Sequence, residues 1–253
     1  MSKASRPYAL SLAGHDPSGG AGLTADVKVF NTLGLQGLSV CTALTYQSED
    51  RFDGLEWVSL PQIIRQTELL LDRYPVQVLK VGLVESWPVL EGILVWLRQK
   101  RPDLTIVWDP ILKASAGFDF HSTEANRVPK AMAELVDLIT PNWEEMEQLV
   151  PHHPATEGAR QWSRYSAVLL KGGHRADAPG VDLVLDGEAV HELLPTANAQ
   201  PWPKHGSGCV LSAAIVAHKA LAPALPWVQT CLRAKAYIER YMASSEGLLG
   251  MHA

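Results

Sequence analysis

Short β-type runs alternate with longer helical segments along the whole chain, and this alternation constrains the fold more than any other feature. The sequence predicts strands at 8–13, 37–46, 76–81, 105–108, 136–139 and 167–170, a short run at 55–60, a hairpin of 181–185 with 189–193, and helices at 20–33, 61–74, 88–99, 125–135, 207–220 and 227–242. Strands connected through helices form right-handed βαβ units. We therefore expect an α/β fold with a mostly parallel sheet, in a single domain over residues 1–253.

Charge and cysteine usage exclude several classes of protein. The formal net charge is −5 and the basic residues are scattered, so no nucleic-acid partner is expected. Cys41, Cys209 and Cys231 form no CxxC pair, which argues against a disulfide framework and a structural zinc site. No apolar run has the length of a membrane span or a signal-peptide core, so we expect no membrane contact and a cytoplasmic location.

Polar and glycine residues follow the predicted strands where a parallel sheet binds its ligands. In such sheets the site lies beyond the carboxyl ends of the strands. The residues at these ends are the glycine-rich turn 14–20, Gln47, Gly82, Asp109-Pro110, the segment 140–142 and Lys171-Gly172-Gly173. The sequence therefore predicts one site built from several strand ends.

The segment Lys204-His205-Gly206-Ser207-Gly208-Cys209 leads directly into an apolar helix. Backbone N–H groups at such a helix start, together with the helix dipole, favour phosphate oxygens. The same field favours the thiolate of Cys209, which could then act as a base or nucleophile. Two other interpretations remain: a glycine-rich cap with a buried cysteine, and a Cys–His hydrolase pair of Cys209 with His205.

Three further motifs can each be interpreted in two ways, as part of a ligand site or as a purely structural feature. The turn 16–22 precedes a helix, so its amides suit a polar or anionic ligand, or it lets helix and strand pack closely. Asn142 and Glu145 have the spacing of a helix cap, and with Asp109 they could hold a hydrated Mg²⁺ through water. Lys171 is either a solvated loop lysine or a phosphate contact.

Taken in order, these motifs resemble the hydroxymethylpyrimidine/phosphomethylpyrimidine kinases of thiamin biosynthesis, from about residue 8 to residue 240. The matching segments are 13–22 with Ala25-Asp26, 42–44 with Gln47, 80–83, 109–111, 140–142 with Glu145, 170–174 and 205–209. The resemblance implies the ribokinase-like fold, a three-layer α/β/α arrangement with a small strand lid.

The resemblance also implies a role for each matching residue. The substrate pocket would be formed by Gly14, Asp16, Ala21, Asp26, Gln47, Leu83 and Ile111. The anion hole would be formed by Gly206, Ser207 and Gly208, and Cys209 would be the catalytic base. The residues in contact with the ATP phosphates would be Lys171, Asn142 and His205. The metal ion would be served by Asp109 and Glu145.

The implied activity is ATP- and Mg²⁺-dependent phosphorylation of 4-amino-5-hydroxymethyl-2-methylpyrimidine and of its monophosphate, by a homodimer. Two alternatives are a pyridoxal kinase and a non-catalytic pyrimidine-binding protein. The latter is motivated by Ser115, which stands where the family usually has a lysine, with Lys113 two residues earlier. The segment 150–160 is also shorter than in the family, and the family's C-terminal extension has no counterpart in this sequence.

Overall fold

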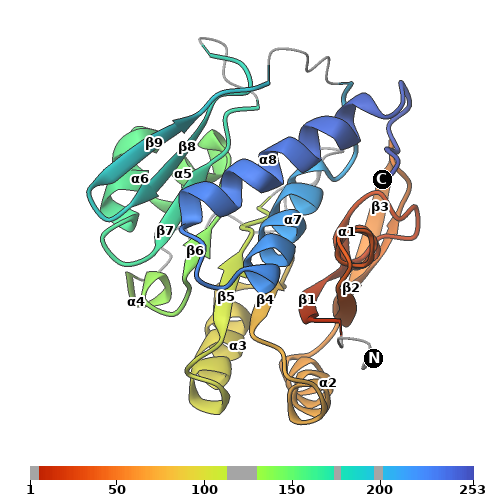
Figure 1. The fold of residues 1–253 in the computed structure, drawn as a ribbon. Helices are drawn as coiled ribbons and strands as arrows, with labels where there is room; N and C mark the ends of the chain where they lie inside the picture. Colours follow the sequence, from red (N-terminus) through yellow and green to blue (C-terminus); the bar gives the residue numbers. More distant parts are fainter. Residues whose placement is uncertain (1–5, 113–129, 174–177, 197–201) are drawn as a thin grey trace, which may run out of the picture.

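The structure is a computed structural model that describes residues 6–112, 130–173, 178–196 and 202–253. Its strands are β1 (Tyr8–His15), β2 (Gln36–Gln47), β3 (Phe52–Trp57), β4 (Val78–Val81), β5 (Thr105–Trp108), β6 (Leu138–Ile139), β7 (Ala167–Leu170), β8 (Asp182–Asp186) and β9 (Ala189–Leu193). In the described ranges they form one sheet in the order β3-β2-β1-β4-β5-β6-β7-β8-β9 (Figure 1).

The centre of this sheet is parallel, as the alternating pattern predicts. Strands β2, β1, β4, β5, β6 and β7 pair in parallel, whereas β3 and the β8–β9 hairpin pair antiparallel at the two edges. The antiparallel β2–β3 pair corresponds to the small strand lid that the resemblance implies. Because the central strands are parallel, their carboxyl ends meet at one edge of the sheet.

Helices cover both faces of the sheet (Figure 1). One face carries α1 (Gly22–Thr32), α7 (Ser207–Leu221) and α8 (Trp227–Ala243), and the other carries α2 (Leu60–Arg73), α3 (Trp87–Lys100), α4 (Lys130–Ala133), α5 (Trp143–Leu149) and α6 (Ala155–Trp162). Successive side chains on a strand point to opposite faces. In β4, Leu79 and Val81 therefore join the α2/α3 core, while Val78 joins the α7 core. Lys80 alternates to the α7 face with Val78 and is fully buried there.

Two elements differ from the sequence-based expectation. Only the first half of the short run at 55–60 lies in a strand: β3 begins earlier, at Phe52, and ends at Trp57, and Leu60 already belongs to α2. Helix α6 was not expected, because its buried face consists of small residues and one tryptophan: Ala155, Gly158, Ala159 and Trp162. They follow the i, i+3, i+4, i+7 spacing of a helix, but small side chains give a weak hydrophobic signal.

Some sequence-based predictions fall on residues that the structure does not describe. Only the part of the expected helix 125–135 that begins at Lys130 is described, as α4. The positions Lys113 and Ser115, on which the comparison with the family's usual lysine depends, lie outside the described residues. None of the helices in the described part of the chain combines the length and apolarity needed to span a bilayer.

Candidate active site

Two glycine-rich turns, far apart in the sequence, meet at the carboxyl edge of the sheet. The first precedes α1 and the second precedes α7. Gly206 has a φ of +71°, in the left-handed region, and a Cβ there would lie 2.2 Å from the carbonyl oxygen of Gly20 and 2.7 Å from the Cα of Ala21. Only glycine combines this backbone angle with this approach. The contact brings the N-termini of α1 and α7 together.

Asp16 and His205 join the same two turns through their side chains. His205 Nε2 lies 2.9 Å from Asp16 Oδ2, and the same carboxylate accepts hydrogen bonds from the backbone N–H groups of Ser18 and Ala21, each at 2.8 Å. Burial raises the pKa of Asp16, but the bonds from His205, Ser18 and Ala21 outweigh it and lower that pKa to about 2. The carboxylate therefore shapes the turn. Both Asp16 and His205 are buried.

Cys209 lies in the first turn of α7, and its environment corrects one sequence-based expectation. Burial raises the pKa of the Cys209 thiol to about 11, although the Lys80 ammonium and a hydrogen bond from the Gly22 backbone act in the opposite direction. The expectation that the helix field favours the thiolate is wrong as a net effect, because desolvation of the charged form is larger. At neutral pH the thiol predominates. Cys209 nevertheless lies beside a charged group, because its carbonyl oxygen accepts a hydrogen bond from Lys80 Nζ at 3.3 Å.

Asp109 and Lys171 form the charged centre of the site. Asp109 Oδ1 accepts from Lys171 Nζ at 3.1 Å and from Thr140 Oγ1 at 2.8 Å. Burial raises the pKa of Asp109, but the ammonium groups of Lys171 and Lys80 outweigh this, so the pKa falls below its ordinary value. A Cβ on Gly208 would lie 3.4 Å from Lys171 Nζ. Lys171 therefore reaches from the end of β7 to the start of α7.

Asn142 and Glu145 form the helix cap that their spacing predicts. The Asn142 N–H donates to Glu145 Oε2 at 2.6 Å, and the Glu145 N–H donates to Asn142 Oδ1 at 2.8 Å. Burial is the main cause that raises the pKa of Glu145, and Lys171 Nζ lies 3.6 Å from Glu145 Oε2. The cap thus places a second carboxylate beside Lys171.

These two carboxylates are the residues that could serve a magnesium ion. Among the described residues, no cluster of three or more His, Cys, Asp or Glu side chains could hold a metal ion by itself. Mg²⁺ usually keeps several waters and takes only one or two carboxylates when substrate phosphates are present. Asp109 and Glu145, which share Lys171, fit that smaller set.

Lys80 is a member of the site that the sequence-based interpretation did not assign. It is fully buried, and its Nζ lies 2.7 Å from Asp26 Oδ1, 3.3 Å from the Cys209 carbonyl oxygen and 3.9 Å from Asp109 Oδ2. The other oxygen of Asp26 accepts from Ser11 Oγ at 2.5 Å. Asp26, which the resemblance places in the pyrimidine pocket, therefore has both oxygens bonded inside the protein. A lysine within the apolar run 76–81 was the available signal for a buried charge pair.

The remaining residues assigned to the pyrimidine pocket lie around β1, β2 and the end of β4. A Cβ on Gly14 would meet Leu83 Cδ2 at 3.1 Å, and a Cβ on Gly82 would meet Ile111 Cδ1 at 3.7 Å. Leu83 is held by a 2.5 Å bond from Thr42 Oγ1 to its carbonyl oxygen. Gln47 Nε2, at the end of β2, donates to Thr45 Oγ1 at 2.8 Å.

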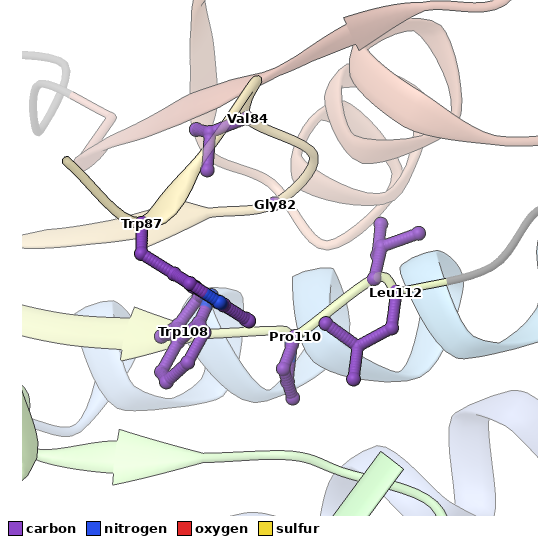
Figure 2. A pocket seen from close by; sticks show the side chains of 7 residues that line it. Gly82, Val84, Trp87, Trp108, Pro110 and Leu112 are labelled. Atoms are coloured by element: carbon purple, nitrogen blue, oxygen red, sulfur yellow. The ribbon is translucent and has the colours of Figure 1, made fainter. Parts of the chain in front are cut away.

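A narrow apolar hollow adjoins this region. It is lined by Gly82, Val84, Trp87, Trp108, Pro110, Ile111 and Leu112 (Figure 2). Trp87 and Trp108 meet edge to face with ring centroids 6.0 Å apart. The hollow has no room for a water molecule, so Trp87 and Trp108 belong to the packed core behind Ile111 and do not form a substrate site.

Solved structures define the class of protein. The chain aligns with the ADP complex of Bacillus subtilis pyridoxal kinase at a TM-score of 0.82 and 25% identity, covering 98% of each chain. It also aligns with the phosphomethylpyrimidine kinase of Clostridium difficile 630 at a TM-score of 0.75 and 27% identity, covering 92% of this chain and 98% of that one. The layers, the strand order and these likenesses identify a ribokinase-like vitamin kinase fold.

Sequence comparison then gives the family. The profile described as phosphomethylpyrimidine kinase matches residues 16–252. The hydroxymethylpyrimidine/phosphomethylpyrimidine kinase of Rhizobium meliloti is 33% identical over 95% of this chain and 92% of its own length. The thiamine biosynthesis bifunctional protein ThiED of Geobacter sulfurreducens is 34% identical over 92% of this chain, which spans 48% of that longer protein. The chain belongs to the phosphomethylpyrimidine kinase family.

Proposed function

We propose that this chain is a kinase that transfers the γ-phosphoryl group of ATP to the hydroxymethyl group of 4-amino-5-hydroxymethyl-2-methylpyrimidine, and then phosphorylates the monophosphate to the diphosphate. One observation carries the proposal: two glycine-rich helix starts meet at Gly206, with Lys171 over Gly208 and beside Asp109. Membership of the family supports the substrate class. Phosphoryl transfer depends mainly on positioning and on neutralising charge, and this arrangement supplies both.

The first task of the site is to hold the transferred group. The backbone N–H groups of Gly206, Ser207 and Gly208 at the start of α7 donate hydrogen bonds to the oxygens of the phosphoryl group, and the helix dipole adds a partial positive charge. Lys171 contacts the phosphates as a compact cation. Asn142 contributes by fixing the turn beside Lys171, to which it is joined by a backbone bridge. His205 contributes by holding the Gly206 turn through Asp16.

The second task is to remove the proton of the attacking hydroxyl group. As the bond from the hydroxymethyl oxygen to phosphorus forms and the bond to the ADP oxygen breaks, that proton passes to the sulfur of Cys209. Because burial raises the pKa of this thiol to about 11, only a small thiolate fraction is present at neutral pH. The rate should therefore rise with pH. Asp109 and Glu145 would hold Mg²⁺ through water, and the ion would neutralise phosphate charge.

The experiment is a product analysis. The protein is incubated with the pyrimidine alcohol, ATP and Mg²⁺, and the products are identified by mass. The monophosphate, the diphosphate and ADP are expected. Tight binding of the alcohol without ADP formation would instead indicate a non-catalytic pyrimidine-binding protein. Ester or amide cleavage without ATP would indicate the hydrolase that the Cys209–His205 pair suggested.

Pyridoxal is the second candidate substrate. The likeness to the B. subtilis pyridoxal kinase favours it, and both alcohols carry a hydroxymethyl group on a flat heteroaromatic ring. A parallel turnover assay with the two alcohols at equal concentration separates them. We expect kcat/KM for the pyrimidine alcohol to be the higher value.

We further propose that residues 1–253 are one kinase domain that works as a homodimer in the cytoplasm. The exposed side chains of Leu44 and Tyr46 on β2, next to the edge strand β3, support a pairing surface there. Light scattering after size exclusion tests the dimer. Fluorescent tagging in cells tests the location.

A further inference from the structure

A buried ion pair between α8 and β8 has no role in the scheme above. Lys235 lies on α8 and Asp182 is the first residue of β8, and both are nearly fully buried. Lys235 Nζ donates to Asp182 Oδ2 at 2.7 Å and to the carbonyl oxygen of Gly180 at 2.6 Å. Helix α8 crosses the sheet on the side that carries β7 and β8 (Figure 1).

The second oxygen of Asp182 is bonded to the turn that carries Lys171. The backbone N–H of Gly172 donates to Asp182 Oδ1 at 2.7 Å, and the carbonyl oxygen of Gly172 accepts from the Gly180 N–H at 3.1 Å. On the other side of the turn, the Lys171 N–H donates to the Pro141 carbonyl oxygen at 2.8 Å. Gly172, the residue that follows Lys171, is therefore fixed at both its N–H and its C=O.

The same cluster also reaches the chain that leads to α7. Glu239, one helical turn after Lys235, accepts from the Thr196 N–H at 3.2 Å and from Thr196 Oγ1 at 2.7 Å. Lys235 Nζ lies 3.9 Å from Glu239 Oε1. Side chains of one helix thus hold two connections, one bearing Lys171 and the other leading from β9 toward Gly206.

Stability alone does not account for the choice of a charged pair here. A buried ion pair often stabilises a fold no more than a well-packed apolar pair of the same size. An apolar side chain at position 182 would, however, leave the Gly172 N–H without its acceptor. The carboxylate is required for the turn, and Lys235 is required to compensate the carboxylate.

We propose that Asp182 and Lys235 are positioning residues for nucleotide binding. Asp182 holds the Lys171–Gly172 turn in the geometry that places the Lys171 ammonium between Asp109 and Gly208, and Lys235 keeps Asp182 in place. Neither side chain contacts the reacting atoms. The inference rests on the proposed function, because it takes the phosphates of ATP as the ligand of Lys171.

The test uses two double variants that differ in one property. K235M/D182N removes both charges but keeps an oxygen that can accept from the Gly172 N–H, whereas K235M/D182L removes both charges and the acceptor. R233M, a change at an exposed residue of the same helix, is the control. The affinity for AMP-PCP is measured by calorimetry, and the KM values for ATP and for the pyrimidine alcohol are measured separately. Thermal unfolding confirms that each variant folds.

We expect K235M/D182L to bind AMP-PCP about tenfold more weakly than K235M/D182N, since a buried donor loses its partner. The KM for ATP should rise in parallel, while the KM for the pyrimidine alcohol stays constant. R233M should match the wild type. K235M alone keeps the acceptor for the Gly172 N–H but leaves the Asp182 carboxylate uncompensated, so it should be less stable than K235M/D182N in thermal unfolding.

Equal AMP-PCP affinity for the two double variants would overturn the inference, as would an equal rise in both KM values. If K235M/D182L does not fold, D182L is replaced by D182V; failure of that variant too would make the pair a requirement of the fold and overturn the inference. Failure of the proposed function has a different signature. In that case the wild-type protein itself binds no AMP-PCP or forms no phosphorylated pyrimidine.

Discussion

Replacing Gly206 with alanine tests whether the contact between the two glycine-rich turns creates the site. A Cβ at this position would lie 2.2 Å from the Gly20 carbonyl oxygen, whereas real Cβ atoms essentially never come closer than 3.0 Å. The turns must therefore separate by at least 0.8 Å, the difference between these two distances. The left-handed φ of +71° adds about 1–2 kcal/mol of conformational strain for a non-glycine residue.

From these two effects we expect G206A to lose about 2–5 kcal/mol of unfolding free energy, because overpacking adds about 1–3 kcal/mol to the strain. A displacement of roughly 1 Å in a catalytic site can lower the rate about 100-fold. The assays are urea unfolding and kcat/KM for the pyrimidine alcohol with saturating ATP. The loss should appear in kcat, since the proposed mechanism places Gly206 in the anion hole.

Gly34 provides a matched control for the backbone strain. It also has a positive φ, +87°, but no atom lies within 4 Å of a Cβ placed there. G34A should therefore lose only about 1–2 kcal/mol from the left-handed φ and keep its activity. If G206A retains a kcat/KM within threefold of G34A, the reasoning about the two turns is refuted.

Three other predictions follow from buried charges. C209A should bind the pyrimidine alcohol but should turn it over about 10²- to 10⁴-fold more slowly than the wild type. The kcat of the wild type should rise between pH 7 and pH 9, because the pKa of the Cys209 thiol is about 11, and this rise should be absent in C209A. The pKa of Asp16 is lowered to about 2 from 3.8, so its stabilisation is present above pH 4 and lost as the pH falls toward 2. By linkage this amounts to about 2 kcal/mol, and acid unfolding of D16N should lack that step. K80M should lose about 3–5 kcal/mol of unfolding free energy, measured by urea unfolding, and K80M/D26L should recover most of this loss. Equal unfolding free energies for K80M and K80M/D26L would contradict the pairing of Lys80 with Asp26.

Local patterns predicted much of the fold and several members of the candidate site. Alternating strand and helix periods indicated a parallel sheet covered on both faces, and the structure confirms this arrangement. The N-x-x-E spacing predicted the cap formed by Asn142 and Glu145. Each of these patterns depends only on residues that are close to one another in the sequence, so it can be recognised without the structure. Helix α6 was missed because its buried positions are mostly small residues.

What the sequence by itself determined, therefore, is which residue types stand at the ends of the strands and at the helix starts. The tertiary structure alone decided which of them meet: Asp16 bonds to His205 across 189 positions, and Asp26 pairs with Lys80 across 54. It also decided the protonation of Cys209, since burial opposes the helix field that the local sequence suggests. The physical reason is that burial and Coulomb interactions depend on distances in space, and the position of a residue in the sequence does not contain these distances.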